Sequence, residues 1–173
     1  MKKDEKNNNR EQVKRSSFEK TEDFLAHVKA ILERYESIFN KAASESTIDV
    51  FEKENQIKLS SELRAYFKVL NGLDEGEWIS RLSPINKLTT LKDYPWFSEE
   101  SRFRTVTYER HFVLGDLMID SHQWVVKLNR TGQPEEILEM DFETKVANNI
   151  CEFMEVFVNE SPYALIGNEE ERK

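Results

Sequence analysis

QWVVKLNRTGQPEEILEM, residues 123–140, is the stretch that decides the fold class. Its first six residues are rich in the aromatic and β-branched side chains that favour strands, and the second strand is expected at Glu136-Ile137-Leu138-Glu139-Met140. Between them, residues 129–132 end in Thr131-Gly132, a turn signal. The stretch therefore predicts two antiparallel strands joined as a hairpin.

Further strands are predicted upstream of this hairpin. Residues 105–108 and 111–114 have strand composition, and Trp78, Ile79 and Leu82 suggest another short strand. Residues 84–101 contain two prolines and are predicted to be irregular. We therefore expect a central antiparallel sheet of four to six strands.

Helical spacing of apolar residues flanks this region on both sides. One amphipathic helix is predicted over residues 18–41, with Tyr35, Ile38 and Phe39 on its apolar face. The next is predicted from a cap in residues 44–47 through Asn55, burying Ile48, Val50 and Phe51. A third is predicted to begin at Ser60 or Ser61 and to end at Asn71-Gly72, and a final helix to carry Val146, Ile150, Phe153, Met154 and Phe157 before Pro162. N-terminal helices, a central sheet and a C-terminal helix packed on that sheet make an α+β fold.

The 173 residues suit one domain, and the charge is unevenly distributed. Residues 1–16 are predicted to form a disordered arm of net +3, and residues 166–173 a frayed tail of net −1. Because the whole chain carries −8, the predicted domain over residues 17–165 carries −10. An acidic body of this kind is poorly suited to nucleic-acid backbones and well suited to a cationic protein partner.

The remaining composition bounds location and chemistry. A single cysteine, Cys151, excludes an internal disulfide, and no run of apolar residues is long enough to cross a membrane. The N-terminus has no apolar core after its charges, so no secretory signal is predicted, and the expected location is the cytoplasm.

Three groups of residues between about 44 and 160 follow one another in a characteristic order: Ile48, Phe51 and Glu52 with Ile57, Leu59, Leu63, Tyr66, Phe67 and Asn71-Gly72; the stretch 113–128 around Gly115-Asp116; and Ile150-Cys151-Glu152-Phe153-Met154. Together these segments resemble the SUKH superfamily. The chain departs from the family pattern at Ser60, where proline is usual, at Cys151, where serine is usual, and in the length of its first helix. The resemblance implies an α+β domain without a catalytic centre. It implies either a bacterial immunity protein that neutralises a nuclease or deaminase toxin, or a regulatory or scaffold module for an endogenous protein.

The residues themselves offer little catalytic chemistry, and we expect neither enzymatic activity nor a cofactor. There is no phosphate-binding glycine motif, no His-Glu-x-x-His and no cysteine pair for zinc. Asp116, Met118, Asp120 and His122 would share one face of a continuous strand, where they could hold a metal. A bend at Asp120-Ser121 would separate them, leaving turn capping or partner contact as the alternatives, and no metal site is assigned.

Acidic clusters beside aromatic residues are the candidate partner-binding surface. Residues 132–160 contain eight acids against Lys145 alone, and Asp74, Glu75 and Glu77 are predicted in a loop beside Trp78. A solvated face and an electrostatic footprint for a basic toxin both fit such runs. The candidate contact residues are Asp74, Glu75, Glu77, Trp78, Glu99, Glu100, Asp116, Asp120, Glu136 and Glu139.

Overall fold

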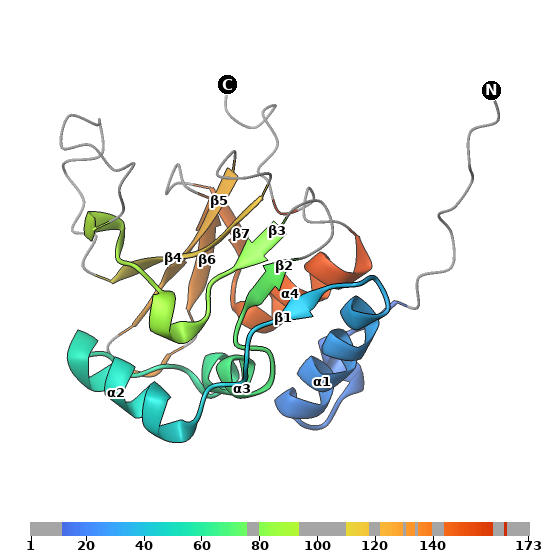
Figure 1. Cartoon of the computed structure of the whole chain (residues 1–173), viewed down its shortest axis with the longest axis horizontal. Coiled ribbons are helices and arrows are strands. Elements are labelled where there is room, and N and C mark those ends of the chain that lie inside the picture. Colours follow the sequence, from blue (N-terminus) through green and yellow to red (C-terminus); the bar gives the residue numbers. More distant parts are fainter. Residues whose placement is uncertain are drawn as a thin grey trace.

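The computed structural model has an α+β fold, in which four helices accompany a seven-stranded antiparallel sheet in the part of the chain that it describes (Figure 1). It describes residues 12–75, 80–93, 110–117, 122–129, 131–133, 135–139, 144–160 and 165, with Glu75 described by its backbone alone. The helices are α1 (Thr21–Glu33), α2 (Glu45–Asn55), α3 (Ser61–Val69) and α4 (Ile150–Asn159). The strands are β1 (Ile38–Phe39), β2 (Leu73–Glu75), β3 (Ser80–Leu82), β4 (His111–Leu117), β5 (His122–Lys127), β6 (Glu136–Glu139) and β7 (Lys145–Ala147). Single 3₁₀ turns occur at η1 (Arg15–Ser17), η3 (Ile85–Lys87) and η4 (Leu91–Asp93).

The sheet is a meander in which each strand pairs with the next one along the chain, from β1 to β7. The hairpin predicted from residues 123–140 is present as β5 and β6, with Val125 opposite Leu138 and Lys127 opposite Glu136. The described strands exceed the four to six that we expected, because β1, β2 and β7 have two or three residues each. Such short strands show no measurable alternation in the sequence, so their pairing depends on their neighbours.

The prediction of one helix over residues 18–41 is wrong. Helix α1 ends at Glu33, and Glu36 adopts a left-handed backbone with φ of 62°. The amide of Ser37 donates to the Leu32 carbonyl and that of Glu36 to the Glu33 carbonyl, which is the Schellman arrangement of a helix end. The chain then turns into edge strand β1, where Ile38 is 53% exposed instead of lying on an apolar helix face.

The predicted caps of α2 and α3 are confirmed. The Ser44 hydroxyl accepts the amide of Thr47, and the Ser60 hydroxyl accepts the amide of Leu63. One detail differs, because Val50 is 52% exposed and does not join Ile48 and Phe51 in the core.

The core lies between the sheet and the helices, and α4 packs on the sheet as expected (Figure 1). Trp124 of β5 is fully buried, with its ring centroid 5.3 Å from that of Phe153 and 6.1 Å from that of Phe157 in α4. Its indole nitrogen donates to the Leu165 carbonyl at 2.9 Å. Burial of these aromatic surfaces contributes to the driving force for folding.

The end of the predicted N-terminal arm is part of the fold. Val13 is 3% exposed, and its backbone exchanges two hydrogen bonds with the Asn159 side chain of α4. The Arg15 amide donates to Glu155, also in α4. The predicted disorder therefore does not extend to residues 12–16, whereas residues 1–11 and the predicted tail at 166–173 lie outside the described residues.

Two further expectations fall outside the description. The strand predicted at residues 105–108 and the part of the irregular segment beyond Asp93 are among the residues that the structure does not describe. Within the described residues, no helix has the length and apolar character needed to span a membrane.

Candidate functional site

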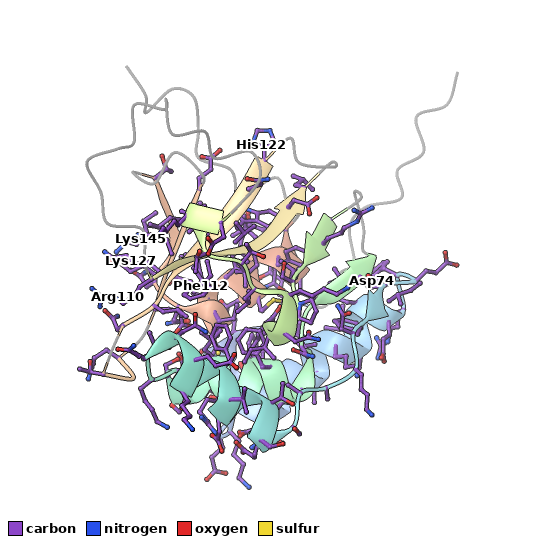
Figure 2. The ribbon with its side chains drawn as sticks, turned by 60° about the vertical axis from the view of Figure 1, so that its left-hand side comes forward. Asp74, Arg110, Phe112, His122, Lys127 and Lys145 are labelled. Carbon is purple, nitrogen blue, oxygen red and sulfur yellow. The ribbon has the colours of Figure 1, made fainter. Side chains whose placement is uncertain are left out.

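The acidic run at residues 132–160 does not form an open acidic surface in its described part. The Glu136 carboxylate lies 3.0 Å from Lys127 Nζ and 3.5 Å from Lys145 Nζ, on the two neighbouring strands. The hydrogen bond from Lys127 lowers the pKa of Glu136. Figure 2 shows Lys127 and Lys145 close together near Arg110, so this end of the sheet is not predominantly acidic.

Glu139 and Glu135 are buried inside the domain. Glu139 is 5% exposed, and its Oε1 lies 3.6 Å from Nδ1 of His122. The expectation that Glu139 belongs to an exposed contact surface is therefore wrong. Two other acids of the run also have structural partners, because Glu152 accepts the amide of Asn148 and Glu155 accepts that of Arg15.

Glu135 joins two helices at their N-terminal ends. Its Oε2 accepts the hydroxyl hydrogen of Ser60, the cap of α3, at 2.7 Å, and its Oε1 accepts the amide of Ile150, the first residue of α4, at 2.8 Å. The side chain is 1% exposed, and burial raises its pKa. The carboxyl group is thus a structural clamp between the two helices.

Another buried acid holds the segment that carries part of the family resemblance. Glu52 is 6% exposed, and its Oε1 accepts the amide of Leu59 at 2.9 Å while its Oε2 accepts from Lys58. The Arg64 guanidinium contacts Glu52 as well, and it also pairs with Glu45 and Asp49 on α2. These acids hold α2 against α3 and are occupied by intramolecular partners.

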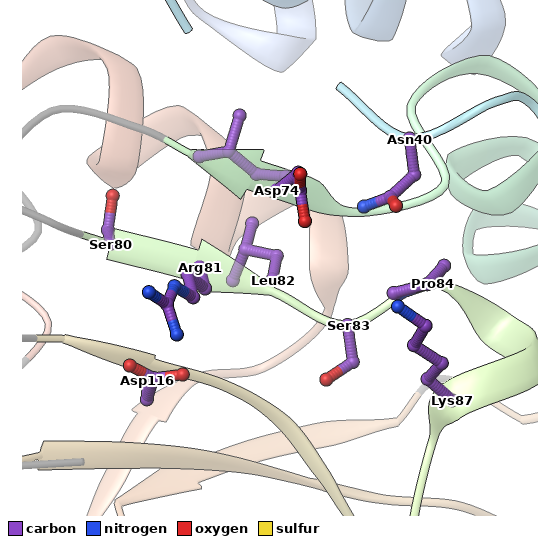
Figure 3. Close-up of a pocket in the computed structure, with 10 residues that line it drawn as sticks. Asn40, Asp74, Ser80, Arg81, Leu82, Ser83, Pro84, Lys87 and Asp116 are labelled. Atoms are coloured by element: carbon purple, nitrogen blue, oxygen red, sulfur yellow. The ribbon is translucent and has the colours of Figure 1, made fainter. Parts of the chain in front are cut away.

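Asp74 and Asp116 are the two predicted contact residues that the fold brings to one place. They line a hollow of about 490 Å³ over β2, β3 and β4, which we call the β2–β4 hollow (Figure 3). In the strand register Asp116 of β4 lies directly opposite Arg81 of β3, and the register of Leu73 with Leu82 places Asp74 of β2 on the other side of Arg81. Arg81 therefore stands between the two carboxylates. The described lining residues are Asn40, Leu73, Asp74, Ser80, Arg81, Leu82, Ser83, Pro84, Lys87 and Asp116.

Three charged side chains of the hollow are available to a ligand. Asp74, Arg81 and Lys87 are exposed, and in the described part of the chain none of their side chains makes a hydrogen bond or an ion pair within 4.0 Å. This differs from the acids of α2 and β6, which are paired. The lining carries two acids and two bases, so its formal charge is zero.

Two glycines allow the backbone to close behind the hollow. A Cβ on Gly115 would lie 2.2 Å from the Arg81 carbonyl oxygen, and a Cβ on Gly72 would lie 2.3 Å from that of Leu82. Gly72 also has φ of 84°, which glycine adopts without strain. The Asn71 side chain accepts the amide of Ile85 and donates to the Lys41 carbonyl, which holds the adjoining loops together.

Sequence reasoning missed Arg81 and Lys87, and it placed Asp74 and Glu75 in a loop instead of strand β2. In β3 the side chains alternate, with Ser80 and Leu82 buried and Arg81 between them exposed. This alternation is the feature that could have indicated an outward-facing Arg81. Glu77, Trp78, Glu99, Glu100 and Asp120 lie outside the described residues, as does the side chain of Glu75.

The strand proposed to hold Asp116, Met118, Asp120 and His122 on one face is not continuous. Asp116 lies near the end of β4, opposite Gln123 in the strand register. His122 is the first residue of β5 and lies opposite Leu117. Neighbouring residues alternate between faces, so Asp116 and His122 belong to opposite sides of the sheet. Met118 and Asp120 are not described.

The described residues offer no group of three histidine, cysteine or acidic side chains that could hold a metal ion. Cys151 is buried in α4, and burial raises the pKa of its thiol to about 12, which disfavours the thiolate form that nucleophilic cysteines use. The exposed charged side chains of the β2–β4 hollow can bind charged groups. Comparison with protein-family models and with curated proteins finds no match to this chain.

Proposed function

We propose that this protein is a non-enzymatic immunity protein that binds a basic toxin of the nuclease or deaminase class and covers its active or substrate-binding surface. The resemblance to the SUKH superfamily suggests this class of function. Several of the residues that carry the resemblance have structural roles, since Glu52 holds Leu59 and Asn71 holds Ile85. Such roles would preserve the scaffold while the contact surface varies between partners.

The observation that carries the proposal is the unpaired charge at the β2–β4 hollow. Five other acids have intramolecular partners or are buried: Glu45, Glu52, Glu135, Glu136 and Glu139. Asp74, Arg81 and Lys87 have no such contacts among the described residues and surround a hollow. Charged side chains that remain free in the isolated protein are suited to complementary contacts with a partner.

Growth rescue tests the function. Co-expression of this protein with the toxin domain encoded next to it is expected to restore growth of cells that the toxin alone arrests. An unrelated immunity protein expressed at the same level serves as the control and should not rescue. If the cells remain arrested although both proteins are present, the immunity function is wrong, and the regulatory or scaffold alternative becomes the better proposal.

Long-range attraction to a basic partner is a separate prediction. The net charge of −8 should steer a basic toxin toward the protein, because complementary fields raise association rates. Raising the salt concentration from 50 to 500 mM is expected to slow association about tenfold or more, since the Debye length shortens from roughly 14 Å to about 4 Å. Stopped-flow measurement of the association rate checks this, and a rate independent of salt would exclude electrostatic steering.

A further inference from the structure

We propose that the β2–β4 hollow recognises a partner segment that carries charges of both signs. A lysine or arginine of the partner contacts Asp74, and an aspartate or glutamate of the partner contacts Arg81 and Lys87. This inference rests on the proposed function for the identity of the partner, and it adds where the partner binds and which side chains it presents.

The first argument is the arrangement of the charges. Asp74, Arg81 and Asp116 follow one another across β2, β3 and β4, and directly opposed residues of antiparallel strands have Cβ atoms about 5 Å apart. At that spacing an arginine can fold back onto a neighbouring carboxylate. Yet within the described chain Arg81 makes no ion pair, and Figure 3 shows its guanidinium directed away from its strand, on the side of Asp116.

The second argument is the contrast with the same kind of row elsewhere in the sheet. Lys127, Glu136 and Lys145 also occupy neighbouring strands, and there the side chains do pair, at 3.0 and 3.5 Å. The charges of the row at Lys127 are therefore paired with one another, whereas Arg81 and Asp74 make no such pair in the part of the chain that the structure describes. A partner with opposite charges in matching positions would complete these contacts.

The third argument concerns the sign of the partner's charge. Because the described lining is formally neutral, a purely basic segment would gain attraction at Asp74 and lose it at Arg81 and Lys87. In a segment with one basic and one acidic side chain, the basic one is attracted to Asp74 and the acidic one to Arg81 and Lys87. Net acidity of the whole protein then governs the approach of the toxin, and the hollow governs the local register of the contact.

The fourth argument is that the floor of the hollow is fixed before binding. Strands β3 and β4 approach closely at Gly115, and the amide of Ser83 donates to the Leu114 carbonyl at 2.7 Å. Asn71 holds the following turn through the amide of Ile85. Little backbone ordering is needed on binding, which preserves affinity.

Charge-reversal variants test this inference. Asp74→Lys and Lys87→Glu should each weaken binding of the catalytically inactivated toxin domain by about 30-fold or more, because each replaces an attraction by a repulsion. The matched controls are Glu54→Lys and Lys53→Glu, two exposed charges near the C-terminal end of α2. The controls should change the dissociation constant by less than about threefold. Asp74→Asn and Lys87→Gln give milder versions, for use if a reversal lowers the melting temperature.

Titration calorimetry with the purified toxin domain separates the outcomes. If both reversals weaken binding and the controls do not, the hollow is the contact surface. If the wild type binds and protects cells but reversals and controls behave alike, the hollow is not the contact surface and the immunity function stands. If the wild type binds without protecting cells, the immunity function fails, and the reversals still decide where binding occurs. If the wild type does not bind the toxin, both proposals are wrong.

Discussion

Replacing Glu135 by alanine is expected to lower the free energy of unfolding by about 3 kcal/mol, because two buried hydrogen bonds lose their common acceptor. The Ser60 hydroxyl and the Ile150 amide donate to the two carboxylate oxygens, and Ser60 also caps α3. With alanine at this position, the Ile150 amide at the start of α4 would have no acceptor in a site that is 1% exposed in the wild type.

The adjacent residue is the matched control. Glu136→Ala removes an acid that is partly exposed and paired with Lys127 and Lys145, and such surface pairs contribute less than about 1 kcal/mol. Urea unfolding followed by circular dichroism gives both values. If the two substitutions lower the free energy of unfolding equally, the hydrogen bonds of Glu135 to α3 and α4 stabilise the fold no more than a surface ion pair does.

The pH dependence of this site has a defined sign. Burial raises the pKa of Glu135 above its ordinary value of 4.5, so the folded protein binds this proton more tightly than the unfolded chain does. The stability that this adds is fully present below the ordinary pKa and is lost as the pH rises through the raised pKa. The cost of Glu135→Gln should therefore be larger at pH 5 than at pH 8. A cost that grows with pH would contradict the raised pKa.

Gly115→Ala is expected to lower the free energy of unfolding by about 2 to 3 kcal/mol, because the added methyl group has no space between β3 and β4. Its Cβ would lie 2.2 Å from the Arg81 carbonyl oxygen and 3.0 Å from the Leu82 Cα. Both are backbone atoms, so the clash is relieved only by moving the strands apart. This movement would also displace Arg81 and Asp116, whose backbones lie opposite each other on the same two strands.

Gly132→Ala is the control for this substitution. Gly132 has φ of 70°, and the nearest atom to an added Cβ is Lys58 Cγ at 3.3 Å, in a flexible side chain. Alanine there should cost only the left-handed backbone penalty, about 1 kcal/mol. Thermal or urea unfolding compares the two variants. If Gly115→Ala is no more destabilising than Gly132→Ala, then the packing of β3 against β4 does not require a residue without a Cβ at position 115.

Local patterns predicted the parts of the fold that local interactions determine. The hairpin of β5 and β6 and the serine caps of α2 and α3 were correct, because turn and cap chemistry lies within a few residues. The end of α1 was missed, since Glu36 adopts a left-handed conformation that glutamate rarely takes. Beyond this turn β1 pairs with β2, a contact that the local spacing of apolar residues does not reveal.

The site was predicted less well, because counting charges does not show which of them have partners. Asp74 and Asp116 were candidates from separate parts of the sequence, and nothing local indicated that they line one hollow, while the run containing Glu136 and Glu139 was misread as open acidic surface. The buried position of Glu135 depends on two helix ends that are distant in the sequence. Opposite charges on neighbouring strands become visible only once the register is known.

Inhibition of the purified toxin is the most direct test of the proposed function. The toxin domain encoded beside this protein would be assayed on its own substrate while this protein is added in steps. We predict that toxin activity falls linearly to zero at one equivalent of the wild type, and that the Asp74→Lys variant requires a large excess. Undiminished toxin activity at a tenfold excess of the wild type would contradict the account.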